Sequence, residues 1–200
     1  MAVVYETKVR GQKLAWKKMG LRRKPGLKEK REIEILKKLN HAHMIRLVGT
    51  YTHQRVLGLL LYPVAICDLH TFFDDAEGYW SNTADEFQME RLKQIGYFPD
   101  YVRTLKHKAW PIYSQIGCLV SAISYLHSQS IRHKDLKPSN ILLSRGRLYL
   151  SDFGSATDFS LLSRSATGNG GGTPMYFSPE VRFPYHRIGT ISDNKSVLDS

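Results

Sequence analysis

Residues 133–143, HKDLKPSNILL, place several charged and polar side chains directly before an aliphatic run. Charged side chains are almost never fully buried without a partner, whereas consecutive aliphatic residues are usually buried. The chain must therefore pass from a loop into a buried strand over a very short distance. A second aliphatic run, Leu148 to Leu150, follows the turn residues Ser144 to Gly146. The two runs predict a hairpin that holds the charged loop in place.

The chain begins with a part that is rich in predicted strands. Short apolar runs between turn residues are typical of strands. Apolar residues three apart, Ile33, Leu36 and Leu39, instead predict one helix over residues 27–40. The predicted strands cover residues 3–6, 13–17, 43–51 and 55–61, and the first two form a hairpin around Gly11.

Residues 74–109 have no apolar block, are first acidic and then basic, and are rich in aromatic residues. We expect them to form an inserted excursion on the surface. Within them, Thr83 to Glu86 matches a capping box, and Gly96 is expected to end the helix that starts there. From Pro111 the apolar residues recur along one helix face as far as about Ser128, which predicts a helix leading into the charged loop.

The charged loop contains a small set of groups suited to binding metal-bound phosphate. Asp135, Lys137 and Asn140 lie within six positions, and Asp152 follows twelve residues after Asn140. Carboxylate and amide oxygens are ligands that Mg²⁺ accepts, and lysine is a common phosphate ligand. The spacing therefore indicates a site for Mg²⁺ and phosphate.

The sequence around these residues resembles the eukaryotic protein kinase family. His133 to Asn140 matches the catalytic loop H-R-D-L-x-x-x-N, with Lys134 in place of the arginine, and Asp152 to Gly154 matches D-F-G. Gly172 to Glu180 is similar to the end of the activation segment, with Ser178 where alanine is usual.

Two further residues follow the order of the same family. Leu14 to Lys17 is similar to the V-A-I-K strand, so Lys17 is the candidate strand lysine. Its helix partner is Glu32 or Glu34, and we favour Glu32 because it precedes Leu36 by four residues, as the glutamate does in the family that the sequence resembles.

This resemblance implies an α+β, two-lobed kinase fold. The smaller, β-rich lobe with one helix would cover residues 1–61, the hinge residues 62–66, and the mainly helical lobe residues 67–200. The family's first strand and its glycine-rich loop G-x-G-x-x-G should precede residue 1. At the other end, Asp199 resembles the start of a long helix of the second lobe. We therefore expect a domain that is incomplete at both ends and impaired in activity.

The resemblance also implies ATP and Mg²⁺ as cofactors. Lys17 would hold the α- and β-phosphates and pair with Glu32, while Asn140 and Asp152 would bind Mg²⁺.

The hydroxyl of a protein serine or threonine would be the acceptor. Asp135 would accept its proton, and Lys137 would stabilise the γ-phosphate. Lys137 followed by Pro138 is typical of serine/threonine kinases, and Thr173, which we place with the catalytic residues, indicates the same class.

The adenine ring would lie against the end of the aliphatic strand. Leu61 is the candidate gatekeeper, and the backbone of Pro63 and Val64 would lie near the purine. An apolar wall suits a flat base.

Lys134 predicts a difference in regulation. Lysine lacks the two-pronged contact that arginine makes with phosphate. Control by phosphorylation of Ser163, Ser165 or Thr167 is therefore expected to be weaker.

The composition excludes several other classes of protein. The longest nearly uninterrupted apolar run, Val56 to Ile66, has 11 residues, and a spanning helix needs about 20, so no membrane span is predicted. The start has no secretory signal, and Cys67 and Cys118 cannot form a framework of disulfides. A reducing, intracellular setting, cytoplasmic or nuclear, is expected. The oligomeric state cannot be predicted.

The positive charge is concentrated near the N-terminus. Residues 1–50 contain 14 Lys and Arg against 4 Asp and Glu, in a chain of formal net charge +11. We interpret this as a solvated basic face beside a phosphate-binding cleft, because no RNA-binding aromatic signature accompanies it. Nucleic-acid binding is a distant alternative. A nucleotide-binding or scaffolding pseudokinase, which keeps the fold without phosphate transfer, is the second alternative.

Overall fold

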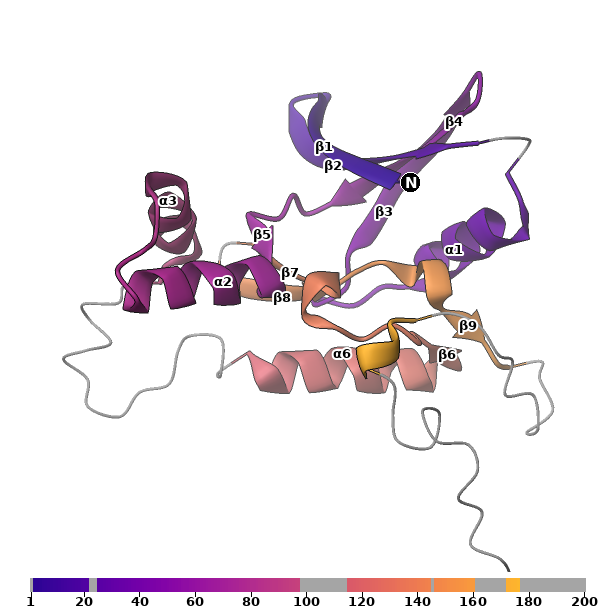
Figure 1. Ribbon diagram of the computed structural model, residues 1–200. Helices are drawn as coiled ribbons and strands as arrows, with labels where there is room; N and C mark the ends of the chain where they lie inside the picture. Colours follow the sequence, from indigo (N-terminus) through magenta and orange to yellow (C-terminus); the bar gives the residue numbers. More distant parts are fainter. Residues whose placement is uncertain (1, 22–24, 98–114, 145, 161–171, 177–200) are drawn as a thin grey trace, which may run out of the picture.

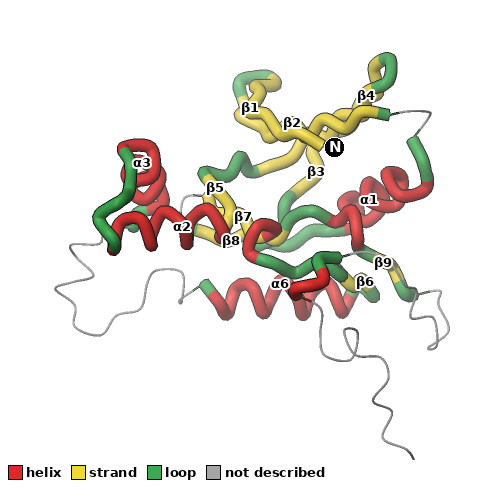
Figure 2. Tube along the Cα trace, in the orientation of Figure 1, coloured by secondary structure: helices red, strands yellow, loops and turns green. Residues whose placement is uncertain are grey.

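The computed structural model describes residues 2–21, 25–97, 115–144, 146–160 and 172–176 (Figure 1). Among the described residues, one region contains a four-stranded sheet and a single helix, and the other contains three α-helices and two small sheets (Figure 2). This arrangement is the two-lobed α+β fold that the resemblance implies. Within the described residues, no helix is both long and apolar enough to cross a membrane.

The sheet of the first lobe is antiparallel throughout, in the order β1-β2-β4-β3. Its first hairpin turns at Arg10 and Gly11, whose φ angles are 49° and 81°. Positive φ at both central residues is what a two-residue type I′ turn requires. All four predicted strands are confirmed. They are β1 (Ala2–Val9), β2 (Gln12–Gly20), β3 (Arg46–His53) and β4 (Val56–Tyr62).

The predicted helix is confirmed as α1 (Leu27–Lys38). Its apolar residues Ile35 and Leu36 are buried in the core, and so is Glu32. The helix ends two residues before the predicted Asn40, because Leu39 already has extended backbone angles.

The second lobe contains α2 (Leu69–Trp80), α3 (Glu86–Ile95) and α6 (Ile116–Ser128). The predicted capping box is shifted by two residues, because Asp85, not Thr83, caps α3. The Asp85 carboxylate accepts from the amide of Gln88, and the Gln88 side-chain oxygen accepts from the amide of Asp85. Gly96 ends α3 with a φ of 83°, as predicted.

Residues 74–97 of the expected surface excursion are mostly exposed, but part of the segment packs into the core. Leu92, Ile95 and Tyr97 are buried beside α2, and Arg91 forms a two-pronged bond with the buried Asp75 at 2.8 and 2.7 Å. Apolar residues spaced one helical turn apart supply this buried face, so a continuous apolar block is not needed. Residues 98–109, the rest of the predicted excursion, lie outside the described residues.

Helix α6 ends at Ser128, as predicted, but its apolar face is only partly covered. Ala122 and Leu126 are buried, whereas Ile116 and Val120 are 48% and 60% exposed.

Two small sheets carry the loops of the second lobe. The predicted hairpin forms from β7 (Ile141–Ser144) and β8 (Arg147–Leu150), with β5 (Cys67–Asp68) paired to β7. A second sheet pairs β6 (Ile131–Arg132) with β9 (Thr157–Asp158). Three short 3₁₀ helices complete the described elements: η1 (Pro138–Asn140), η2 (Phe153–Ser155) and η3 (Pro174–Tyr176).

The two lobes share one hydrophobic core. The segment between α1 and β3 forms backbone hydrogen bonds with β8. The amide of Ile45 donates to the carbonyl of Leu150 at 3.0 Å, and the amide of Leu150 donates to the carbonyl of His43 at 2.9 Å. Buried side chains from both lobes, including Ile35, Leu59, Leu126 and Leu150, belong to a single cluster. The two lobes are therefore joined by backbone hydrogen bonds and by a common core.

Candidate active site

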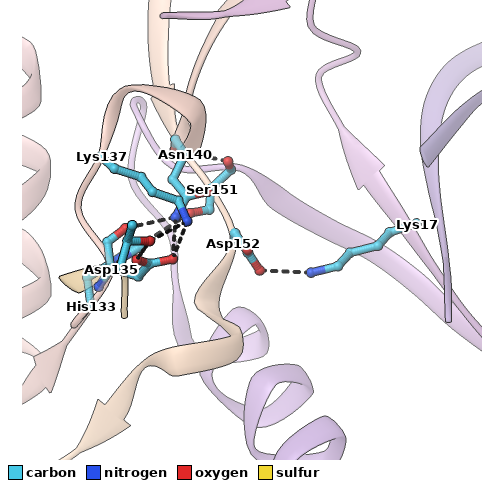
Figure 3. Close-up of polar contacts among 8 residues, drawn as sticks. Lys17, His133, Asp135, Lys137, Asn140, Ser151 and Asp152 are labelled. Carbon is cyan, nitrogen blue, oxygen red and sulfur yellow. Dashed lines mark hydrogen bonds and ion pairs between the residues drawn. The ribbon is translucent and has the colours of Figure 1, made fainter. Parts of the chain in front are cut away.

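Lys17, in the middle of β2, is the cation where three segments meet. Figure 3 shows its contact with Asp152. Its Nζ donates to Glu32 Oε1 at 2.7 Å and to Asp152 Oδ1 at 2.9 Å. Only 14% of the Lys17 side chain and 6% of the Glu32 side chain are exposed. One strand, one helix and one loop thus share a single ammonium group.

Opposing effects act on the pKa values of this ion-paired group. Burial alone would lower the pKa of Lys17, but the carboxylates of Glu32 and Asp152 outweigh it and raise that pKa. Burial would likewise raise the pKa of Asp152, yet the Lys17 ammonium holds it below its ordinary value. Lys17 and Asp152 are therefore both charged at neutral pH.

The pairing of Lys17 with Glu32 is confirmed, and Glu34 is not involved. Glu32 is 5% exposed and faces the core side of α1, whereas Glu34 is exposed to solvent. The two positions are two residues apart, which places them on different faces of a helix.

The charged loop and the D-F-G loop are joined by His133. Its Nε2 lies 2.8 Å from the carbonyl oxygen of Ser151, which can only accept, so this nitrogen carries the hydrogen. The amide of Asp135 donates to the other ring nitrogen at 3.3 Å, and the Phe153 ring meets the imidazole edge-on at 5.0 Å. Burial lowers the pKa of His133. A neutral histidine therefore has a structural role between the two loops.

Two non-glycine residues of these loops have left-handed backbone conformations. Lys134 has a φ of 64° and Asp152 a φ of 59°. Such conformations are costly for most residues and tend to persist where surrounding contacts enforce them, often at functional sites. Lys134 directly follows His133, and Asp152 directly follows Ser151, so both lie next to the hydrogen bond between His133 and Ser151.

Asp135 accepts hydrogen bonds from three side chains. Thr173 donates to Oδ1 at 2.8 Å, while Lys137 and Asn140 each lie 3.0 Å from Oδ2. Lys137 also donates to the Thr173 hydroxyl at 2.7 Å. Burial would raise the pKa of Asp135, but these donors outweigh it and lower that pKa. The structure therefore brings all three predicted catalytic residues into one hydrogen-bonded group.

Asn140 links this group to the D-F-G loop. Its carbonyl oxygen accepts from the amide of Ser151 at 2.9 Å and from the Ser151 hydroxyl at 3.0 Å, directly before Asp152. Its side-chain nitrogen is engaged by Asp135, through the carbonyl at 2.8 Å and through Oδ2. The amide oxygen of Asn140 and the carboxylate of Asp152 are thus the groups that fit Mg²⁺, a cation that prefers oxygen ligands.

The three candidate adenine-binding residues lie at the end of β4 and just beyond it. Leu61 pairs with Ala15, which lies two residues before Lys17. The side chains of Leu61, Ala15 and Lys17 therefore lie on one face of the sheet. Pro63 and Val64 follow the strand, and the Val64 carbonyl accepts from the hydroxyl of Ser144 at 2.9 Å. These residues therefore connect to Lys17 through the sheet and to the second lobe through β7.

A cavity of about 310 Å³ opens beside the ion-paired group. Glu32, Asp152 and Lys17 form one side of it. Its other lining residues are Met19, Gly20, Lys28, Glu29 and Gly154.

Sequence reasoning missed Ser151 and the cavity residues of α1. The three bonds that Ser151 makes involve its backbone and a small hydroxyl, which leave no periodic pattern in a sequence. Lys28 and Glu29 could have been found as charged residues in the first turn of the helix that carries Glu32.

Comparison with known proteins agrees with this geometry. A model of the protein kinase domain matches residues 1–194. The cAMP-dependent protein kinase catalytic subunit PRKX of Mus musculus is 34% identical over 151 residues, which are 75% of this chain and 34% of that protein. CBL-interacting protein kinase 30 of Oryza sativa subsp. japonica is 32% identical over 76% of this chain and 26% of its own length.

Serine/threonine-protein kinase fused of Drosophila melanogaster is 30% identical over 76% of this chain and 15% of its own length. The chain thus spans between 15% and 34% of the length of these three relatives. The match to the protein kinase domain nevertheless covers nearly all of this chain. This chain belongs to the protein kinase domain family.

Proposed function

We propose that this chain is an ATP-dependent protein serine/threonine kinase, which transfers the γ-phosphoryl group to serine or threonine hydroxyls of proteins. The observation that carries this proposal is the continuous connection from Lys17 to Asp135, which runs through Asp152, Ser151 and His133. Phosphoryl transfer depends mostly on positioning and on charge stabilisation, and these residues supply both.

Lys17 is the proposed ligand of the α- and β-phosphates. Its ammonium is held by two carboxylates at 2.7 and 2.9 Å, so it enters the reaction already oriented. The cavity beside it supports a place for the phosphates. Leu61, Pro63 and Val64 would hold the adenine ring at the apolar end of β4.

Asn140 and Asp152 are the proposed ligands of Mg²⁺. The side-chain carboxylate of Asp152 is 47% exposed, so it can be reached by a hydrated cation. When bound, Mg²⁺ would neutralise charge on the phosphate oxygens.

Asp135 is the proposed acceptor of the proton from the attacking hydroxyl. Its 2.8 Å bond from the Thr173 hydroxyl supports this role, since the same carboxylate oxygen can meet a hydroxyl donor. A lowered pKa keeps Asp135 ionised and able to orient that donor. Lys137, between Thr173 and Asp135, would stabilise negative charge on the transferring group.

The proposed substrates are proteins that present a serine or threonine side chain. The proposed setting is the reducing interior of a cell, which the two free cysteines, Cys67 and Cys118, support.

The test is transfer of labelled γ-phosphate from Mg-ATP to serine, threonine and tyrosine peptides by the whole chain. We expect labelling of serine or threonine peptides and a loss of at least about a hundredfold in Asp135→Asn, the scale of a general base. Asp74→Asn, an exposed aspartate of α2, is the control and should keep the rate. ATP binding without transfer, or equal rates in both variants, would contradict the proposal.

A further inference from the structure

Lys38, in the last turn of α1, forms an ion pair with Asp158 of β9. Lys38 Nζ lies 2.6 Å from Asp158 Oδ2, and the two residues are 120 positions apart in the chain. No motif of the sequence indicates this contact.

The Asp158 carboxylate is oriented by its own loop. The amide and hydroxyl of Ser160 both donate to Oδ1, at 3.0 and 2.6 Å, which leaves Oδ2 to Lys38. The backbone of Asp158 pairs with Ile131 of β6, just before the charged loop. Lys38 thus meets a carboxylate with a fixed direction. The bond from Lys38 and those from Ser160 lower the pKa of Asp158 to about 2.

The C-terminal end of α1 has a second attachment to the second lobe. The hydroxyl of Tyr125 in α6 accepts from the amide of Asn40 at 2.8 Å and lies 3.4 Å from the carbonyl of Lys38. The N-terminal end of the helix differs, because Leu27 is 81% exposed and Gly26 provides no side-chain cap. The helix is therefore held mainly from its C-terminal end.

The same two segments also meet at the ammonium of Lys17. Glu32 lies six residues before Lys38, about 9 Å along the helix, and Asp152 lies six residues before Asp158. Lys17 binds Glu32 and Asp152 at one point, and Lys38 binds Asp158 at another. Lys38 thus adds an ion pair to the Tyr125 contacts at the C-terminal end of the helix, while Glu32 attaches its middle.

We propose that the Lys38–Asp158 pair is a positioning pair that sets the direction of α1 and so holds Glu32 against Lys17. The inference rests on the proposed kinase activity, in which Lys17 must be aligned with the phosphates. Exposed ion pairs contribute little to global stability, and the Lys38 side chain is 57% exposed. The effect should therefore appear in the rate and in the local opening of α1, with an unchanged melting temperature.

The experiment compares Lys38→Ala with Lys37→Ala, which removes a neighbouring exposed lysine from the same turn. We expect Lys38→Ala to reduce kcat about two- to fivefold without a change in KM for the peptide. Backbone hydrogen exchange in residues 29–36 should accelerate by a similar factor. Lys38→Arg keeps the cation and should therefore keep most of the wild-type kcat and most of the wild-type protection against exchange.

A double-mutant cycle with Asp158→Asn separates the pair from its surroundings, because the amide keeps an oxygen for the bonds from Ser160. The double variant should be no worse than either single variant. Additive losses, or equal behaviour of the Lys38→Ala and Lys37→Ala variants, would overturn the inference. If wild-type protein transfers no phosphate, the proposed function fails, and hydrogen exchange alone still decides whether the pair holds α1.

Discussion

His133 shows how one buried side chain can make the stability of the protein depend on pH without taking part in the chemistry. Its ring is neutral in the folded protein, because burial lowers its pKa, and it donates one hydrogen bond to Ser151. In the unfolded chain an ordinary histidine has a pKa of about 6.5. As the pH falls below that value, the unfolded state binds a proton that the folded state refuses, and the free energy of unfolding decreases.

We therefore predict that the protein loses stability between pH 7 and pH 5, and that the loss is smaller in His133→Gln. The amide of glutamine can still donate to Ser151 but does not titrate. Denaturation by urea at pH 7, 6 and 5 measures the slope. Some slope will remain, because burial also lowers the pKa of His41. His70→Gln, at an exposed position, is the control, and an unchanged slope in His133→Gln would refute the prediction.

At the scale of elements, α3 is part of the fold because it completes the core around α2. The Asp75 side chain is 1% exposed and receives both hydrogen bonds from Arg91, so the two helices share a buried carboxylate. Removing one partner of such a pair leaves a buried charge without compensation.

Arg91→Ala is expected to lower the free energy of unfolding by about 1–3 kcal/mol, less than for a fully buried pair because the arginine is partly exposed. Lys93→Ala, an exposed site on the same helix, should change it by less than about 0.5 kcal/mol. Urea denaturation measures both. Equal stability of the two variants would mean that α3 is attached to α2 by its apolar residues alone.

Local patterns predicted most of the described elements, although helix α2 was not predicted. Two other failures have a common cause. Both hairpins, α1 and the end of α6 follow from turn residues and from the spacing of apolar side chains, which act over a few residues. Glu32 was separable from Glu34 by its spacing from Leu36, which matches the resemblance to the family. The buried face of α3 and the Lys38–Asp158 contact depend on partners far along the chain, and neither partner changes the local pattern.

At the scale of the whole molecule, nucleotide binding should stabilise both lobes together. Lys17 belongs to the first lobe and Asp152 to the second, so a ligand held by both residues stabilises the contact between the lobes. A ligand that binds only the folded state adds about 2.7 kcal/mol at a concentration one hundred times its Kd.

We predict that Mg-ATP raises the melting temperature, that EDTA removes most of the increase, and that Asp152→Asn removes it as well. Differential scanning fluorimetry with and without Mg²⁺ measures these shifts. Asp74→Asn should behave like the wild-type protein. An equal increase in Asp152→Asn would show that the nucleotide binds without this carboxylate.

The hydrophobic core shared by the two lobes determines how the protein unfolds. Because the backbone of Ile45 is bonded to Leu150 and their side chains belong to one cluster, loss of either lobe exposes the inner surface of the other. Unfolding should therefore be cooperative, as a single transition with no half-folded species, and neither lobe is expected to survive when expressed by itself.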